Sequence, residues 1–227
     1  LEAHWFEADF RTRDLKILNT NDQDKAEFLQ KILLAAYPLN PGILHESPGF
    51  DIRTEVQFDI RWGWGSSSTL IANVARWFEV DPFELHFKVS GGSGYDVACA
   101  LAQSPILYRL SGKNPRIEAV DFDPPFSKAL YFVYLGKKKD SAKSISLFAN
   151  RIKSSRQEVK RISEITKALI RVKDLDNFRG LIDEHEAILS KVLGTPAIKQ
   201  NMFKDFGGSV KSLGAWGGDF VLLTWND

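Results

Sequence analysis

The sequence has 227 residues, of which 44% are hydrophobic and 26% charged, as expected for a globular protein with one large domain or two small ones. Its 30 lysine and arginine residues nearly balance its 29 aspartate and glutamate residues, which argues against a nucleic-acid partner and against binding to a charged membrane surface. Cys99 is the only cysteine, so an internal disulfide is excluded and a cytoplasmic location is expected, and no apolar run approaches the length of a membrane span.

Alternation of apolar and polar residues predicts strands at the start of the sequence. Residues 1–10 alternate weakly, and a second short strand is expected at residues 15–18. Because the sequence begins inside this strand-like stretch and its only methionine is Met202, we expect a fragment that lacks its natural N-terminus. Apolar residues at helical spacing then predict a helix over residues 26–36, which Pro38 ends.

The next stretch alternates more regularly and leads into a turn and a helix. Residues 51–60 place apolar side chains such as Ile52, Val56 and Ile60 on one side, which predicts a half-buried strand. After the turn, apolar residues recur at helical spacing over residues 70–78. A further short helix is expected after Asp81, where proline follows in a position suited to a first helical turn.

A helix over residues 97–103 and strands at 106–110 and 117–122 complete the first half of the chain. Asp123-Pro124-Pro125 is the best candidate for a boundary, which predicts domains at residues 1–123 and 124–227. In the second domain the pattern predicts a strand at 129–135, three helices within 141–193, a short helix within 197–206, and strands at 210–213 and 220–225.

The turn ahead of the helix at residues 70–78 is rich in glycine and hydroxyl groups, and it reads Trp62-Gly63-Trp64-Gly65-Ser66-Ser67-Ser68-Thr69. A glycine turn that opens a helix aims unpaired backbone N–H groups and the positive end of the helix dipole at one point, which favours a phosphate. The serines could equally serve as ordinary helix caps. The segment is not a Walker loop, because no lysine closes it.

The second glycine-rich segment reads Ser90-Gly91-Gly92-Ser93-Gly94-Tyr95-Asp96 and also precedes a helix. Asp96 is the residue to which we assign a catalytic role, because phosphoryl transfer needs a group that orients or deprotonates the attacking hydroxyl. The alternative is that Asp96 only stabilises the first turn of its helix.

The third glycine-rich segment reads Gly214-Ala215-Trp216-Gly217-Gly218-Asp219 and stands directly before an apolar strand. Either a hairpin turn or close packing of backbone against a ligand would explain its glycines. The four histidines have no metal-ligand spacing among themselves or with Cys99, so no histidine metal site is expected.

Together the three segments, in this order, resemble the GHMP small-molecule kinases. Gly63-Trp64-Gly65-Ser66-Ser67-Ser68 looks like the Gly-Leu-Gly-Ser-Ser-Ala phosphate loop of that family, and Gly92-Ser93-Gly94-Tyr95-Asp96 is similar to its Ser-Gly-x-Asp segment. Gly214-Ala215-Trp216-Gly217-Gly218-Asp219 looks like its third motif. The Gly-Tyr-Asp-Val-Ala string resembles most closely the GYDIA group, near the mevalonate and phosphomevalonate kinases.

The resemblance implies an α+β fold of two domains, an incomplete ribosomal S5-like N-terminal domain and a ferredoxin-like C-terminal domain. It also implies that ATP and Mg²⁺ are cofactors and assigns roles to individual residues. Asp96 would be the base, Ser67 would help to hold Mg²⁺, and Ser93, Gly94 and Lys138 would contact the acceptor. The ATP phosphates would be bound by Gly63, Gly65, Ser66, Ser67, Ser68, Gly214, Gly217 and Gly218.

Three departures from the family pattern stand out. The first family motif, which supplies a lysine, is absent, and we attribute this to the missing N-terminus. A magnesium-binding Glu of mevalonate kinases would fall at Leu85, so Glu84, one place away, is the candidate metal ligand. Asp219 and Trp216 stand where many members have glycine. The lysines at 137–139 form a solvated turn or, as the resemblance implies, bind a phosphorylated acceptor.

The sequence therefore predicts an ATP-dependent kinase that phosphorylates a hydroxyl or phosphate of a small molecule, with mevalonate or phosphomevalonate in isoprenoid synthesis as the expected acceptor. A diphosphomevalonate decarboxylase and a non-catalytic nucleotide-binding protein of the same fold are the alternatives. We expect a cytoplasmic monomer or homodimer whose partner is a small-molecule substrate.

Overall fold

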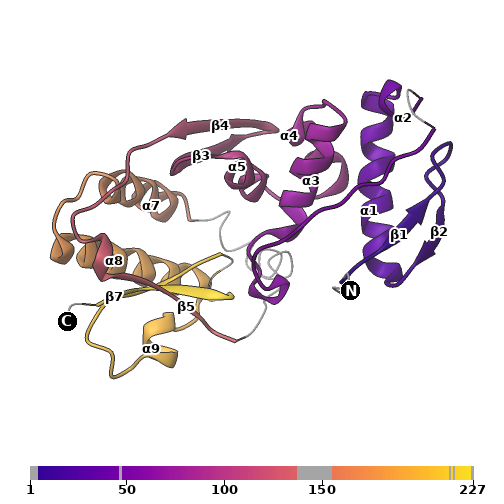
Figure 1. Cartoon of the computed structure of the whole chain (residues 1–227). Coiled ribbons are helices and arrows are strands. Elements are labelled where there is room, and N and C mark those ends of the chain that lie inside the picture. Colours follow the sequence, from indigo (N-terminus) through magenta and orange to yellow (C-terminus); the bar gives the residue numbers. More distant parts are fainter. Residues whose placement is uncertain (1–4, 46–47, 137–154, 215, 217, 226–227) are drawn as a thin grey trace. The chain divides into compact units, whose positions relative to one another are not determined.

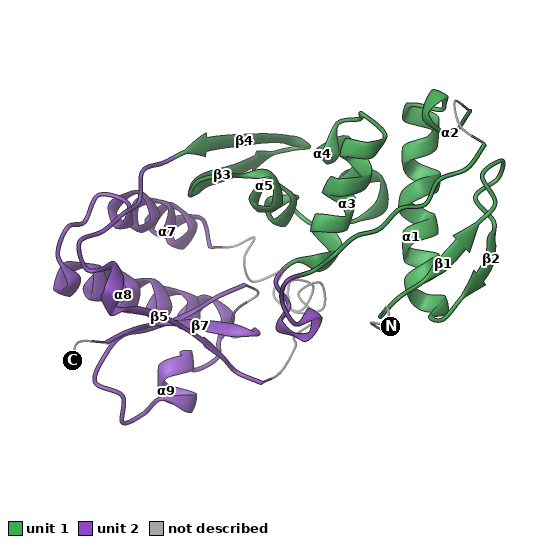
Figure 2. Cartoon of the chain, in the orientation of Figure 1, with its two compact units in different colours: residues 1–56, 65–119 green, residues 57–64, 120–227 purple. Residues whose placement is uncertain are grey.

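The computed structural model describes residues 5–45, 48–136, 155–214, 216 and 218–225 (Figure 1). The chain divides into two compact units, unit 1 with Leu1–Val56 and Gly65–Ala119, and unit 2 with Gln57–Trp64 and Val120–Asp227 (Figure 2). Unit 2 therefore includes a short stretch, Gln57–Trp64, that lies between the two sequence ranges of unit 1. None of the described helices is both long enough and apolar enough to cross a membrane.

Unit 1 mixes helices with two antiparallel hairpins. Its main elements are β1 (Ala8–Phe10), β2 (Ile17–Thr20), α1 (Gln23–Ala36), α2 (Gly42–His45), α3 (Ser66–Trp77), α4 (Pro82–Val89), α5 (Tyr95–Leu101), β3 (Ile106–Ser111) and β4 (Asn114–Ala119). Strand β1 pairs with β2, and β3 pairs with β4. Helices α1, α3 and α4 pack on one another around Ile32, Phe78 and Leu85, which are fully buried. Val97 of α5 joins the same core.

Aspartate caps explain where several of the helices begin. Asp22 accepts a hydrogen bond from the backbone N–H of Lys25 at the start of α1, and Asp81 accepts one from Glu84 at the start of α4. In each case the carboxylate satisfies an N–H group that has no partner inside the helix, and its charge suits the helix dipole. The helices expected from periodicity at 26–36, 70–78 and 97–103 are confirmed, with starts three or four residues earlier for α1 and α3.

The strand expected at residues 51–60 is wrong. Residues 51–56 form neither helix nor strand, and Ile60–Trp62 form a short 3₁₀ helix. Ile52, which the alternation would place on a buried face, is 55% exposed. Alternation indicates which side chains a strand would bury, but a strand also needs a partner for its backbone groups, and the described strands of unit 1 pair only within their own hairpins.

Unit 2 is an antiparallel sheet with helices. Its elements are β5 (Leu130–Tyr134), α7 (Arg156–Leu169), α8 (Leu175–Leu193), α9 (Ile198–Met202), β6 (Val210–Ser212) and β7 (Phe220–Thr224). The described strands follow the order β5-β7-β6, so the last strand of the chain lies in the middle of the sheet. Helix α8 packs on α7 and on β6, and buries Phe178 and Ile182. The strands expected at 129–135, 210–213 and 220–225 are confirmed, and residues 141–154 of the helical region lie outside the described residues.

A buried carboxylate joins α8 to β6. Glu186 is 6% exposed and accepts a hydrogen bond from the hydroxyl of Ser212 at 3.0 Å. The ammonium of Lys211 lies 3.6 Å from the same carboxylate, and Nδ1 of His185 lies 3.4 Å from it. Burial raises the pKa of Glu186, but the hydrogen bonds of His185 and Ser212 and the charge of Lys211 outweigh burial, so the pKa of Glu186 lies below its ordinary value. Burial lowers the pKa of Lys211 more than Glu186 raises it.

Removing the charge of Glu186 alone should lower the free energy of unfolding more than removing the charges of both Glu186 and Lys211. Glu186→Gln is expected to lower the free energy of unfolding by about 3 kcal/mol, because it leaves the ammonium of Lys211 buried without its counter-charge. The double variant with Lys211→Met should recover most of that loss in urea unfolding. Equal losses for the single and double variants would contradict the pairing.

The same pair predicts a loss of stability in acid. The pKa of Glu186 is lower in the folded protein than in the unfolded chain, where it is 4.5, so the ionised carboxylate stabilises the fold above pH 4.5. This stabilisation is lost as the pH falls from 4.5 through the folded pKa. The midpoint temperature of thermal unfolding should therefore fall more steeply between pH 7 and pH 3 for the unaltered protein than for Glu186→Gln.

Candidate functional site

Helix α3 begins without a capping side chain. Gly65 precedes it in the left-handed conformation, with φ of 78°, and as the residue at the N-cap it has no side chain that could accept a hydrogen bond from the first turn. Ser66, Ser67 and Ser68 form that turn, and Ser67 is exposed. Helices α1, α4 and α8 start instead at aspartates that would repel an anion. The start of α3 thus offers backbone N–H groups, serine hydroxyls and the positive end of a helix dipole, which together suit a phosphate.

The turn ahead of α5 is held from two sides within unit 1. Nε2 of His86 lies 3.3 Å from the carbonyl oxygen of Gly92, which only an N–H can satisfy, so His86 carries its proton there. Nδ1 of His86 is buried without a hydrogen-bond partner among the described residues. The hydroxyl of Tyr108 on β3 donates to the carbonyl oxygen of Ser93 at 2.5 Å. Sequence reasoning missed both His86 and Tyr108, since each contacts the turn only through the tertiary fold.

Glycine is required within this turn. Gly94 has φ of 79°, and a side chain there would begin 3.3 Å from the Phe83 ring and 3.3 Å from the hydroxyl of Tyr108. Asp96 follows in the first turn of α5 and is exposed. Burial raises the pKa of Tyr95 to about 12, with smaller contributions from Cys99 and Asp96, so Tyr95 stays protonated at neutral pH. The carboxylate of Asp96 is an exposed group beside this turn that can accept a proton.

Two of the three sequence-predicted features meet in unit 1. Helix α5, which carries Asp96, packs on α3, which carries Ser66, Ser67 and Ser68. Glu84, the candidate metal ligand, is exposed and forms an ion pair with Lys88 at 3.6 Å. Leu85 beside it is a fully buried core residue. Among the residues that the structure describes, no three His, Cys, Asp or Glu side chains come together as a metal site.

The first and third glycine segments meet in unit 2. A pocket of about 380 Å³, which we call the aromatic pocket, is lined by Trp62, Gly63, Trp64, Phe132, Leu213, Gly214, Asp219 and Phe220. Gly63 has φ of 73°, and a Cβ there would overlap the carboxylate of Asp219. The first and third segments are therefore in direct contact. Gly218 is buried, whereas Gly217 and Lys138 lie outside the described residues.

The segment Gln57–Trp64 is fixed to the sheet of unit 2 by rings and one hydrogen bond. The rings of Trp62 and Trp64 lie 4.8 Å apart edge to face, and Phe220 of β7 lies 5.5 Å from Trp64. The hydroxyl of Tyr134 on β5 donates to the carbonyl oxygen of Arg61 at 3.2 Å. The two tryptophans on either side of Gly63 were the only sequence signal for this pocket, because its other ring residues come from distant strands.

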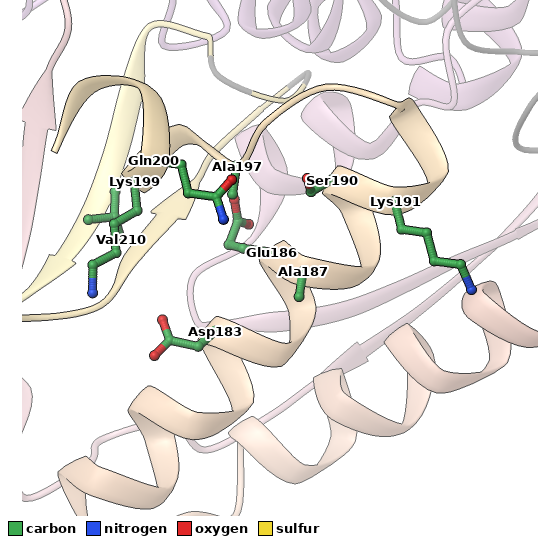
Figure 3. Close-up of a pocket in the computed structure, with 9 residues that line it drawn as sticks. All are labelled: Asp183, Glu186, Ala187, Ser190, Lys191, Ala197, Lys199, Gln200 and Val210. Carbon is green, nitrogen blue, oxygen red and sulfur yellow. The ribbon is translucent and has the colours of Figure 1, made fainter. Parts of the chain in front are cut away.

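A second pocket of about 400 Å³ lies between α8, α9 and β6 of unit 2 (Figure 3). Its lining includes Asp183, Glu186 and Lys191 of α8, with Lys199 of α9. Glu186 is hydrogen-bonded within the fold, and Lys191 lies 3.4 Å from Glu158 of α7. None of the residues assigned from the sequence lines this pocket, so it is not a candidate for the site that the sequence predicts.

The contact between Gly63 and Asp219 can be tested against a matched glycine two residues away. Both Gly63→Ala and Gly65→Ala force an alanine into the left-handed region, which costs about 1 kcal/mol. Only Gly63→Ala also meets a neighbour, since no atom of the described residues lies within 4 Å of the Cβ position at Gly65. We expect a loss in unfolding free energy of about 2 kcal/mol or more for Gly63→Ala and about 1 kcal/mol for Gly65→Ala. Equal losses in urea unfolding would show that Asp219 does not occupy this space.

Solved structures share the fold of this chain. The crystal structure of a Lin0012 protein from Listeria innocua is similar with a TM-score of 0.63 and 20% sequence identity, and the match covers 92% of this chain and 74% of that one. L. major mevalonate kinase in complex with R-mevalonate is similar with a TM-score of 0.56 and 12% identity, over 90% of this chain and 69% of that one. No family model matches the sequence, and neither does any curated protein. The chain thus has a mixed fold of helices and strands that is similar to the fold of L. major mevalonate kinase.

Proposed function

We propose that this protein is an ATP- and Mg²⁺-dependent phosphotransferase that acts on a hydroxyl or phosphate group of a small molecule. The start of α3 is the observation that carries the proposal. A left-handed glycine and three serines leave this helix start without an anionic cap, in a fold similar to that of mevalonate kinase. A phosphate there would receive hydrogen bonds from backbone N–H groups and would be stabilised by the helix dipole.

In this proposal the residues of unit 1 have distinct roles. The backbone and hydroxyls of Ser66, Ser67 and Ser68 bind phosphate oxygens of ATP. Ser67 has the exposed hydroxyl and would bind Mg²⁺ together with those oxygens, in keeping with the preference of Mg²⁺ for few protein ligands. The metal would neutralise phosphate charge. Because Glu84 is paired with Lys88, it is the weaker candidate ligand.

Asp96 acts on the acceptor. Its carboxylate accepts the proton of the acceptor hydroxyl while the hydroxyl oxygen bonds to the γ-phosphorus, and the bond from that phosphorus to the bridging oxygen breaks to leave ADP. The contacts of His86 and Tyr108 with the preceding turn fix the start of α5 and so limit the movement of Asp96. Gly63, Gly214, Gly217 and Gly218 remain proposed phosphate neighbours.

Mevalonate and phosphomevalonate are the acceptors we propose to test first. The L. major enzyme of similar fold was crystallised with R-mevalonate, and the sequence motifs resemble those of the same branch. Cys99 is free and exposed, which suits the reducing cytoplasm, where we place the protein as a monomer or homodimer.

Asp96→Asn is the central test in the full-length protein. We expect ATP binding to persist and turnover with mevalonate or phosphomevalonate to fall by about 10²–10⁴-fold, because the amide cannot accept the proton. Asp24→Asn is the matched control, since Asp24 is also an exposed aspartate in the first turn of a helix. Coupled ADP release would measure both variants. Near-normal turnover of Asp96→Asn would remove the assignment, whereas ATP binding without transfer in the unaltered protein would favour a non-catalytic role.

A further inference from the structure

One face of α8 forms a wall of the second pocket of unit 2, which we call the α8–α9 pocket. Its lining residues recur three and four positions apart, from Asp183 through Ala187 to Lys191, and so lie along one side of the helix. Ala197 and Lys199, at the start of α9, line the same space, which has a volume of about 400 Å³. All of these residues belong to unit 2, so the pocket is complete without any residue of unit 1.

Two charged groups of the α8–α9 pocket already have partners. The carboxylate of Glu186 lies 3.6 Å from the ammonium of Lys211, which is part of the buried cluster between α8 and β6. The ammonium of Lys191 lies 3.4 Å from Glu158 of α7, and its side chain extends away from Lys199 (Figure 3). The charges of Glu186 and Lys191 are therefore compensated within the fold.

Asp183 and Lys199 are different. Asp183 is exposed and Lys199 is half-buried, and neither side chain forms a hydrogen bond or ion pair with any residue that the structure describes. Both side chains extend into the space between α8 and α9 (Figure 3). Within the described residues, the pocket therefore presents a carboxylate and an ammonium without partners, too far apart to form an ion pair with each other.

The charges of Asp183 and Lys199 determine which kind of ligand fits. A simple anion such as phosphate would be attracted by Lys199 but repelled by Asp183, and a simple cation would meet the reverse. An uncharged ligand would displace water from both groups without replacing its hydrogen bonds. A zwitterion that carries an ammonium and a carboxylate would form a charge-assisted hydrogen bond with each of them.

The rest of the lining indicates the size and polarity of such a ligand. Ala187, Ala197 and Val210 give the pocket small apolar surfaces beside its charged groups. A volume of about 400 Å³ is near the lower end for small-molecule sites. An α-amino acid has its ammonium and carboxylate on one carbon atom, and an aliphatic side chain would cover the apolar surfaces.

We propose that the α8–α9 pocket binds the zwitterion of a small α-amino acid with an aliphatic side chain. Asp183 accepts hydrogen bonds from the ligand's ammonium, and Lys199 donates to its carboxylate. The side chain contacts Ala187, Ala197 and Val210. Neither ATP nor phosphoryl transfer takes part in this binding, so the proposal goes beyond the kinase activity and stands or falls independently of it.

L-leucine and two analogues that each lack one charge test whether both charges are read. 4-Methylpentanoate lacks the ammonium and 3-methylbutylammonium lacks the carboxylate, while the aliphatic part is the same in all three. The full chain, without ATP, is titrated with each compound while backbone amide NMR shifts are followed. We expect L-leucine to bind saturably at one site and each analogue to bind at least tenfold more weakly, which corresponds to about 1.4 kcal/mol. No saturable binding of L-leucine, or an analogue that binds as tightly, would overturn the proposal.

Asp183→Asn and Lys199→Gln assign one charge to each end of the ligand. Asp183→Asn should weaken L-leucine binding about tenfold or more but should not weaken binding of 4-methylpentanoate, which has no ammonium. Lys199→Gln should weaken L-leucine binding to a similar extent but should not weaken binding of 3-methylbutylammonium, which has no carboxylate. Because both side chains reach solvent and neither has a partner among the described residues, the fold should persist in both variants.

Asp205→Asn and Lys204→Gln are the matched controls. Both residues are exposed, belong to unit 2 and do not line the pocket. L-leucine binding that is unchanged in either pocket variant, or that falls equally in the controls, would show that the ligand binds elsewhere and would remove the proposal. Turnover with ATP is measured in parallel, and its presence or loss bears only on the kinase proposal.

Discussion

The packing of Gln57–Trp64 onto the sheet of unit 2 is the constraint on which the aromatic pocket depends. Rings from this segment meet rings from β5 and β7, and the carboxylate of Asp219 fills the space that any side chain at Gly63 would need. Two glycine-rich segments that are far apart in the sequence thereby share one pocket. Glycine at position 63 is explained by this contact together with its left-handed backbone, so it is needed for folding even before any ligand is considered.

Residues only two positions apart in the sequence belong to different features, one in each unit. Gly63 lines a pocket with aromatic walls and a carboxylate, whereas Gly65 opens a helix whose first turn favours negative charge. Trp64 separates them and is the last residue of unit 2 before the chain returns to unit 1. The resemblance to a Gly-Leu-Gly-Ser-Ser-Ala loop, which implies a bound phosphate, concerns the helix side of this segment. The tryptophan in the leucine place, by contrast, belongs to the chemistry of the pocket.

Sequence patterns predicted local structure better than they predicted contacts between residues that are distant in the sequence. Helix α1 follows from apolar spacing and from Asp22, because caps and periodicity act within a few residues. The expected strand at residues 51–60 failed because its alternation has no partner strand in the described part of the chain. Asp219 was noticed only as a departure from a family pattern. Its contact with Gly63, like that of His86 with Gly92, joins residues whose proximity arises only from tertiary packing.

The strand order of unit 2 has a consequence for how the protein folds during synthesis. Among the described strands, β7 lies between β5 and β6 and follows both of them in the sequence, so these two strands have no common partner until β7 has been synthesised. The tryptophans of Gln57–Trp64 are synthesised much earlier than the Phe220 ring that they contact, and they must remain in water, or under a chaperone, until that strand is available. Unit 1 can gather its helices before that point, but the segment within it that belongs to unit 2 reaches its place only once β7 is present.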